Sequence, residues 1–198
     1  MIGFDLDLTL IDTKQGFGRV LEALSDELGV PLPIPELTSN LGPPLTMLLE
    51  PYLEAEAIDP AVDRFRELYP ALAVEAIGLL PGAREAIDAV RRHDGVVVVV
   101  TGKFTPNAQL HLDHLDLEVD HVEGKVWGVE KGPVLRRHGA RAYVGDHVHD
   151  MEGARAAGVL GVGVLTGPCS ERELVAAGAD VVLPSLVEFP DWLDAHLT

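Results

Sequence analysis

Two carboxylates stand one residue apart near the start of the chain, in "IGFDLDLT" from Ile2, where Asp5 and Asp7 follow a short apolar run. Such a run is typical of a buried strand, and a lone carboxylate is costly to remove from water. Two neighbouring carboxylates also repel each other, which raises that cost. The pair therefore needs either solvent or a cation to offset its charge.

Further candidate site residues stand at or near the ends of other apolar runs. They comprise a hydroxyl, a glycine, two lysines and two more carboxylates: Thr101, Gly102, Lys103, Lys131, Asp146 and Asp150. Magnesium binds oxygen ligands and keeps several waters, so one or two carboxylates and a substrate phosphate oxygen suffice. A metal and a lysine together neutralise a phosphoryl group that the acids alone would repel. The set therefore indicates Mg²⁺-assisted phosphoryl transfer.

Five short, apolar and largely β-branched segments are expected to form a parallel sheet. They are "IGFDL" from Ile2, "VVVVVT" from Val96, "RAYVGD" from Arg141, "LGVGVLT" from Leu160 and "ADVVLP" from Ala179. Helical patterns separate them, and this alternation predicts an α/β fold with a doubly wound, Rossmann-like parallel sheet and right-handed crossovers. Because ligands bind at the carboxyl ends of such strands, we expect the candidate residues to meet at one edge.

Three helical patterns of this sheet carry their own start and stop signals. They are expected at residues 82–93, 105–115 and 170–178. Thr105 is expected to cap the second of these helices, with Pro106 at its first helical position. Ser170 and Glu173 form a capping box for the third helix, which Gly178 ends.

The stretch between the first two strands is much longer than a simple crossover needs. It reads as helices with apolar stripes, chiefly "GFGRVLEALSDELG" from Gly16 and "PAVDRFRELYPALAVEAIG" from Pro60. We therefore expect a small all-helical cap at residues 14–78, inserted into an α/β core made of residues 1–13 and 79–198. Two short linkers near Thr13 and Gly78 would join the two parts.

Four separate motifs follow one another along the chain: "FDLDLTLIDT", "VVVVVTGK", "EKGPVL" and "YVGDHVHD". In this order, with an insert after the first, they resemble the haloacid dehalogenase-like (HAD) hydrolase superfamily, especially its phosphoglycolate phosphatase-like members with a helical cap. The resemblance implies a Mg²⁺-dependent phosphatase that hydrolyses a small phosphate monoester, either phosphoglycolate-like or a sugar phosphate. It also implies that the reaction passes through an aspartyl-phosphate.

The resemblance further implies a catalytic role for each matching position. Asp5 would attack phosphorus as the nucleophile, and Asp7 would protonate the leaving alcohol and then activate water. Thr101 would donate a hydrogen bond to a phosphoryl oxygen, and Lys131 would balance the charge of nucleophile and phosphate. Thr101 and Lys131 are also predicted to bind the substrate. Three further positions complete the predicted substrate-binding set: Gly102, Lys103 and Arg19.

For the metal, the resemblance implies that Asp146 binds Mg²⁺ together with Asp5 and the backbone carbonyl of Asp7. Asp150 would bind the ion directly or through water. The acids of the third motif are interleaved with His147 and His149, which also leaves open a site for a softer metal. We favour placing these histidines at the pocket rim or in solvent.

The sequence departs from many relatives at two positions. Leu8 stands where they have glycine, which could shift the loop that carries Asp7, and Gly132 follows Lys131 where proline is commoner. Neither change removes a functional group.

Four other functions compete with a phosphatase. A phosphosugar mutase of the same family would return the phosphoryl group to a sugar. A dehalogenase is disfavoured because a halide leaving group needs no acid at Asp7. A phosphorelay receiver domain would lack the inserted cap, and a non-catalytic binding module would not need the full set of acids, hydroxyl and lysine.

The amino-acid composition limits the classes of partner that the protein is expected to bind. The chain has 32 acidic and 15 basic residues and a formal net charge of −17, so its field repels nucleic acids and anionic membranes. A single cysteine, Cys169, excludes an internal disulfide and a multi-thiolate zinc site and fits a cytoplasmic location. The apolar run 96–100 is far too short to span a bilayer. We expect a small phosphorylated metabolite as the partner and a monomer or homodimer.

Overall fold

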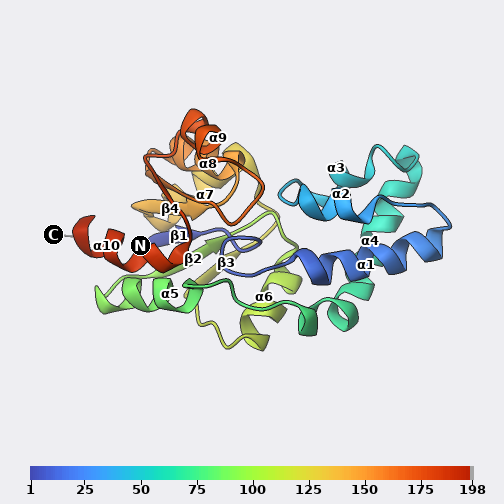
Figure 1. Cartoon of the computed structure of the whole chain (residues 1–198), viewed down its shortest axis with the longest axis horizontal. Helices are drawn as coiled ribbons and strands as arrows, with labels where there is room; N and C mark the ends of the chain where they lie inside the picture. Colours follow the sequence, from blue (N-terminus) through green and yellow to red (C-terminus); the bar gives the residue numbers. More distant parts are fainter. Residues whose placement is uncertain (197–198) are drawn as a thin grey trace.

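The computed structural model describes residues 1–196 of the chain. Its centre is a six-stranded sheet with the strand order β3-β2-β1-β4-β5-β6, and every pair of neighbours is parallel. The α/β, doubly wound fold predicted from the sequence is confirmed (Figure 1). The strands are β1 (Ile2–Phe4), β2 (Val97–Val100), β3 (His121–Glu123), β4 (Ala142–Gly145), β5 (Leu160–Val164) and β6 (Val181–Leu183).

The sixth strand, β3, is not among the five strands predicted from the sequence. β3 pairs only with β2, so it lies at the edge of the sheet, and His121 is exposed. An edge strand needs little apolar surface, and Val122 is the single apolar side chain of this one. The apolar pattern used to recognise the buried strands is therefore missing here.

Helices cover both faces of the sheet (Figure 1). Alternate residues of β2 contribute to the two faces: Val97 and Val99 belong to one apolar cluster, and Val98 and Val100 belong to the other. On one side lie α7 (Lys131–His138), α8 (Val148–Ala157) and α9 (Glu171–Ala177). On the other lie α5 (Ala83–Arg92), α6 (Thr105–His114) and α10 (Phe189–His196).

The helix boundaries test the capping signals read from the sequence. The capping box of Ser170 and Glu173 is present at α9, and Gly178 ends the helix in a left-handed conformation, as predicted. The predicted cap at Thr105 is wrong, because the residue that caps α6 is Phe104 and Thr105 is already helical. Pro106 still lies in the first turn, where a missing N–H group costs no hydrogen bond.

Residues 14–78, which precede α5 in the long connection between β1 and β2, are largely helical. They form α1 (Lys14–Leu28), α2 (Ile34–Ser39), α3 (Leu45–Leu49), α4 (Ala55–Leu72) and the short 3₁₀ helix η1 (Val74–Ala76). These helices lie beyond the carboxyl ends of the strands (Figure 1). The helix predicted from Pro60 begins five residues earlier, at Ala55, and holds Pro60 and Pro70 inside it. Its buried face, which includes Phe65 and Tyr69, compensates for the missing backbone hydrogen bonds.

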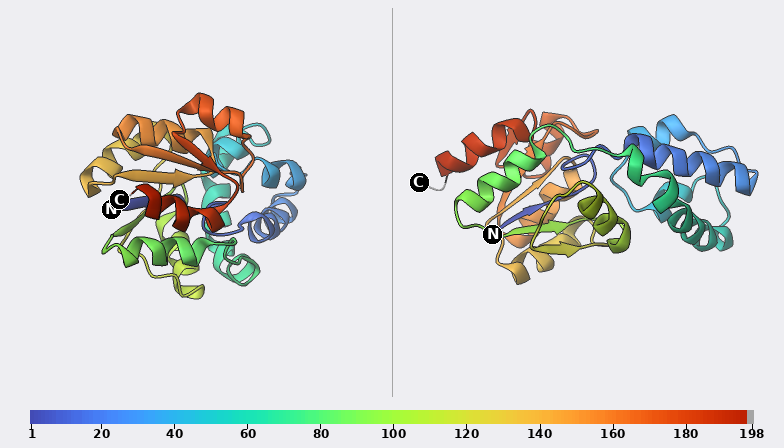
Figure 2. Two further views of the ribbon diagram at one scale, coloured as in Figure 1. Left: turned by 60° about the vertical axis from the view of Figure 1, so that its left-hand side comes forward. Right: turned by 90° about the horizontal axis from the view of Figure 1, so that it is seen from below.

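Two chain segments connect these helices to the sheet, and they run side by side (Figure 2). The backbone N–H of Asp12 donates to Gly78 O over 2.9 Å, and that of Leu80 donates to Leu10 O over 2.9 Å. Ile11 and Leu79 form an antiparallel bridge at the same place. The division into a core and a cap remains a prediction, with these paired segments as its natural boundary. No helix within residues 1–196 is both long and apolar enough to cross a membrane.

Candidate active site

Except for Arg19, the predicted site residues meet at or near the carboxyl ends of three adjacent strands, β2, β1 and β4. Asp5 and Asp7 follow β1, Thr101 follows β2, and Asp146 follows β4. The side chains converge because the three strands are parallel and paired in register, with Phe4 opposite both Val99 and Val144. The remaining members come from the first turns of two helices, Lys131 of α7 and Asp150 of α8.

Three of these carboxylates form a compact acidic cluster, consisting of Asp5, Asp146 and Asp150. One oxygen of each lies within 4.8 Å of those of the other two, and all three side chains are buried. Burial raises the pKa of Asp5 to about 7, although Lys131 lowers it. Burial and the neighbouring Asp150 and Asp5 raise the pKa of Asp146 well above its usual range. A cation would relieve this repulsion, and an all-oxygen ligand set suits magnesium.

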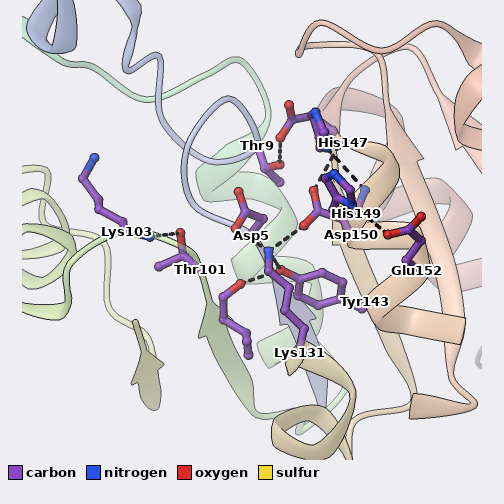
Figure 3. A network of polar contacts seen from close by, with 12 residues as sticks. Asp5, Thr9, Thr101, Lys103, Lys131, Tyr143, His147, His149, Asp150 and Glu152 are labelled. Atoms are coloured by element: carbon purple, nitrogen blue, oxygen red, sulfur yellow. Dashed lines mark hydrogen bonds and ion pairs between the residues drawn. The ribbon is translucent and has the colours of Figure 1, made fainter. Parts of the chain in front are cut away.

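Lys131 supplies part of the balancing charge. Its Nζ donates to Asp5 Oδ1 over 2.9 Å, to Asp150 Oδ1 over 2.6 Å and to the hydroxyl of Tyr143 over 2.8 Å (Figure 3). Only 1% of the residue is exposed. Burial alone would lower its pKa, but Asp150 and Asp5 raise the pKa of Lys131 above its ordinary value. The lysine therefore stays protonated and fixed between two acids.

Asp7 has a separate environment. Its Oδ1 accepts hydrogen bonds from Thr13 Oγ1 over 2.5 Å and from Lys103 Nζ over 2.8 Å. Burial opposes ionisation of Asp7, but Lys103 and Thr13 hold its pKa below the usual range. The structure thus brings Lys103 to the second acid of the motif as closely as it brings Lys131 to the first.

Thr101 is buried and lines a cavity that Asp5 and Asp7 also line, and its Oγ1 accepts a hydrogen bond from Lys103 N over 3.2 Å. Gly102 lies beside it and also lines the cavity. A Cβ atom at Gly102 would come within 3.3 Å of the Trp127 ring, so the absence of a side chain there keeps this wall of the cavity open.

A cavity of about 280 Å³ connects the acidic cluster with helices of the inserted segment. Phe17 of α1 and Phe65 of α4 face the site residues across this cavity. Arg19 does not line it and is exposed, so this structure does not bring Arg19 together with the other predicted site residues. Two residues along a helix correspond to a turn of about 200°, which directs Arg19 away from the side on which Phe17 lies. Arg66 of α4 lines the cavity instead.

Comparison with known proteins agrees with this geometry. A sequence model described as "haloacid dehalogenase-like hydrolase" matches residues 2–155, and a second HAD hydrolase-like model matches residues 135–189. The chain belongs to the haloacid dehalogenase-like hydrolase family. The family identified from the four motifs is thereby confirmed, and the protein is a hydrolase.

Individual members of the HAD family resemble the chain over nearly its full length. It is 31% identical to a phosphoglycolate phosphatase of Caulobacter vibrioides, covering 96% of this chain and 88% of that protein. It is 29% identical to a phosphoglycolate phosphatase of Chromobacterium violaceum, covering 96% and 94%. The solved structure of a haloacid dehalogenase-like hydrolase from Streptococcus pneumoniae superposes with a TM-score of 0.81 at 25% identity, covering 100% and 97%.

The HAD motif loop of this chain accommodates the unusual Leu8 without losing the site. Leu8 has a φ of 58°, a left-handed conformation that costs a non-glycine residue about 1–2 kcal/mol. Its side chain is buried in the apolar core, and its N–H donates to Ile11 O over 2.9 Å, so packing and hydrogen bonding offset the strain. The next residue, Thr9, donates from its hydroxyl to Asp146 Oδ1 over 2.9 Å.

The two histidines of the third HAD motif do not join the acidic cluster found among residues 1–196. His147 caps α8: its ring accepts from His149 N, and its own N–H donates to Asp150 Oδ2 over 3.0 Å. It also lines the cavity. His149 pairs with Glu152 over 2.7 Å (Figure 3). These contacts give both rings structural partners.

Sequence reasoning missed two residues that hold the HAD site together. Tyr143 contacts Lys131 and also donates to Val100 O, and Thr9 positions Asp146. A tyrosine in a strand with apolar neighbours was an available signal, since a buried phenol needs a hydrogen-bond partner. Thr9 stood in the quoted motif without an assigned role.

Proposed function

We propose that the protein is a Mg²⁺-dependent phosphatase that hydrolyses a small phosphate monoester through an aspartyl-phosphate on Asp5. The observation that carries the proposal is the buried cluster of Asp5, Asp146 and Asp150, with Lys131 bonded to two of its members, at the end of a cavity. Mg²⁺ held by these carboxylates would neutralise charge on the transferring group. The phosphatases named among the relatives support the same reaction.

In the first step, an oxygen of Asp5 forms a bond to phosphorus while the bond from phosphorus to the leaving alcohol breaks. Asp7 gives that alcohol its proton. Asp7 is paired with Lys103 in this structure, and an entering phosphoryl group competes for the lysine, which favours protonation of Asp7. In the second step, Asp7 removes a proton from water, the water oxygen bonds to phosphorus, and the bond to Asp5 breaks.

Thr101 and Lys131 serve the phosphoryl group in both steps. The Thr101 hydroxyl is buried beside the cavity and is free to turn toward a phosphoryl oxygen. Lys131 offsets charge on Asp5, which otherwise repels an anionic substrate. The acid at Asp7 favours this chemistry over dehalogenation, because an alkoxide leaving group needs a proton and a halide does not.

The proposal extends to the class of substrate, the role of the helical segment, the cellular location and the oligomeric state. We infer a phosphoglycolate-like or sugar phosphate substrate, with the helical segment 14–78 closing over it as a cap. A cytoplasmic location and a monomeric or homodimeric state belong to the same proposal. The phosphoglycolate phosphatases of Caulobacter vibrioides and Chromobacterium violaceum support the first of these points.

The test is release of inorganic phosphate from a panel of phosphate monoesters, including 2-phosphoglycolate, hexose phosphates and p-nitrophenyl phosphate. We expect release that requires Mg²⁺, stops with EDTA and is absent in Asp5→Asn. Conversion of a hexose 1-phosphate to its 6-phosphate without phosphate release would instead indicate a mutase. No Mg²⁺-dependent phosphate release from any member of the panel contradicts the proposal.

A further inference from the structure

Two cations lie at the cavity wall around one aromatic ring. The guanidinium carbon of Arg66 is 4.8 Å from the centroid of the Phe104 ring, and Lys125 Nζ is also 4.8 Å from it. Both residues and Phe104 itself line the cavity that contains Asp5. Arg66 comes from α4, whereas Lys125 lies between β3 and the 3₁₀ helix η2 (Gly128–Glu130), so distant parts of the chain place positive charge at one point.

Neither Arg66 nor Lys125 forms a buried ion pair with a carboxylate among residues 1–196. Within residues 1–196, no carboxylate lies within ion-pair distance of Lys125. Arg66 pairs with Asp63 of its own helix over 2.9 Å, and partly exposed pairs of this kind contribute little. That bond uses one nitrogen of the guanidinium, whose other donors can bind a second anion.

The backbone holds Lys125 in place. Its φ is 60°, a left-handed conformation that is strained for a residue with a Cβ atom. The N–H of Lys125 donates to Lys103 O over 2.8 Å, and that of Val126 donates to Thr101 O over 2.9 Å. The segment is thus tied to the residues that follow β2, which are themselves site residues. These hydrogen bonds fix the backbone that carries the Lys125 side chain beside the site.

The positions of the few lysines of this acidic chain also indicate an anion-binding role for the cavity. With a net charge of −17, the chain has four lysines. Lys131 and Lys103 are bonded to Asp5 and Asp7, and Lys125 lines the same cavity. Three of the four lysines of an acidic protein therefore gather where an anionic substrate would bind.

We propose that Arg66 and Lys125 form an anion subsite for the leaving group, so that the preferred substrates are phosphate monoesters that carry a second anionic group, either a carboxylate or another phosphate. This inference rests on the proposed function, which places the phosphoryl group at Asp5. The rest of the substrate then extends along the cavity, whose wall includes Arg66 and Lys125. Arginine and lysine bind carboxylate and phosphate through charge-assisted hydrogen bonds.

The test uses pairs of substrates that differ only in the second anion. 3-Phosphoglycerate is compared with glycerol 3-phosphate for a carboxylate, and 1,3-propanediol bisphosphate with 3-hydroxypropyl phosphate for a phosphate. In wild-type enzyme with Mg²⁺ we expect kcat/KM to be at least about tenfold higher for the anionic member of one or both pairs, which is the scale set by a charge-assisted hydrogen bond. The pair with the larger ratio identifies the preferred anion.

Variants then assign that preference to the two residues. Arg66→Gln and Lys125→Met should each lower kcat/KM about tenfold, mainly through KM, for the substrate that carries the second anion. For the matched substrate without that anion, kcat/KM should change less than about twofold. Arg66→Lys keeps the charge and should restore most of the preference. Arg64→Gln is the matched control, because Arg64 lies on the same helix, pairs with Glu27 and Glu67, and does not line the cavity.

Two results overturn the inference in distinguishable ways. Equal kcat/KM for both members of each pair, or an equal fall for both members in the variants, eliminates the subsite and leaves the phosphatase standing. Absence of Mg²⁺-dependent hydrolysis of every monoester, p-nitrophenyl phosphate included, eliminates the phosphatase and the subsite together.

Discussion

At the scale of single residues, Lys131 carries the electrostatic balance of the acidic cluster. One ammonium group bonds to Asp5 and Asp150 and is held by the Tyr143 hydroxyl, with almost no solvent contact. Breaking a buried charge pair by removing one partner is costly because the other charge is left unpaired. Lys131 therefore has a structural role in addition to the catalytic role proposed for it.

Lys131→Met tests this double role. Without metal, at a pH above 7 where Asp5 is ionised, we expect the free energy of unfolding to fall by about 3–5 kcal/mol, since two carboxylates lose their shared cation. Phosphatase turnover should fall at least about a hundredfold, on the scale of losing a donor to developing charge. Urea denaturation and steady-state assays measure the two effects. Lys14→Met, at an exposed lysine, serves as the control, and wild-type values for Lys131→Met would refute both roles.

Residue types at strand ends made much of this site predictable. Asp5, Asp146 and Thr101 could be placed because parallel strands deliver their carboxyl ends to one edge. Partners such as Thr9, 137 positions away from Asp146, could not, because nothing in the local pattern marks a contact over that separation. The position of Arg19, exposed and away from the cavity, could not be predicted for a related reason: its place in the sequence does not show which way a helix turns it.

At the scale of elements, one buried contact joins the helical insert to the sheet side of the molecule. Tyr69 of α4 and His111 of α6 are linked through Tyr69 Oη and His111 Nε2 over 2.9 Å, and their rings meet edge to face. Lys103 Nζ lies 4.7 Å from the Tyr69 ring centroid. The contact thus ties α4 to α6 immediately beside the partner of Asp7.

This contact should weaken in acid. Burial and Lys103 lower the pKa of His111 to about 4, from an ordinary value of 6.5. Between these values the folded protein binds fewer protons than the unfolded chain, so the free energy of unfolding falls as the pH falls through that window. The other groups that act on the ring are Tyr69, Asp7 and His114.

From pH 7 to pH 5 we expect wild type to lose on the order of 1–2 kcal/mol more than His111→Gln, which cannot titrate. Urea unfolding at the two pH values measures the difference. His114→Gln, an exposed change on the same helix, should behave as wild type does. An identical pH dependence in His111→Gln would show that His111 is not the titrating group.

The elements differ in how far sequence could predict them. Strands such as β2 are buried on both faces and read as continuous apolar runs, whereas the edge strand β3 is short and half polar, and was missed. The helical pattern read from Pro60 to Gly78 is displaced along the chain, because α4 begins at Ala55, ends at Leu72 and continues through Pro60, where tertiary packing keeps it intact.

At the scale of the whole molecule, an acidic chain with a net charge of −17 concentrates three buried carboxylates in one place. Only one ammonium group, that of Lys131, is bonded to this cluster within residues 1–196. The mutual repulsion of the three carboxylates opposes folding, and a divalent cation that binds the folded form would offset this repulsion. Stability of the whole protein should therefore respond to magnesium.

We expect Mg²⁺ to raise the free energy of unfolding by about 2.7 kcal/mol at a concentration 100 times its Kd. Thermal unfolding with increasing MgCl₂, against matched ionic strength from NaCl, measures this. Asp146→Asn should lose the response without losing stability in EDTA, because it removes one repelling charge. Asp26→Asn, on an exposed part of α1, should keep the response. An equal response in Asp146→Asn would place the metal elsewhere.

The proposed reaction depends most on Asp5 as the nucleophile, and trapping of the phosphorylated enzyme tests this role directly. Wild-type protein turning over a phosphate monoester with Mg²⁺ is quenched in acid within milliseconds, reduced with borohydride and digested for mass spectrometry. We predict that position 5 is converted to homoserine, only when substrate is present and never in Asp5→Asn. Rapid phosphate release with no modification at position 5, or with the phosphoryl group on another residue such as His147, would contradict the account.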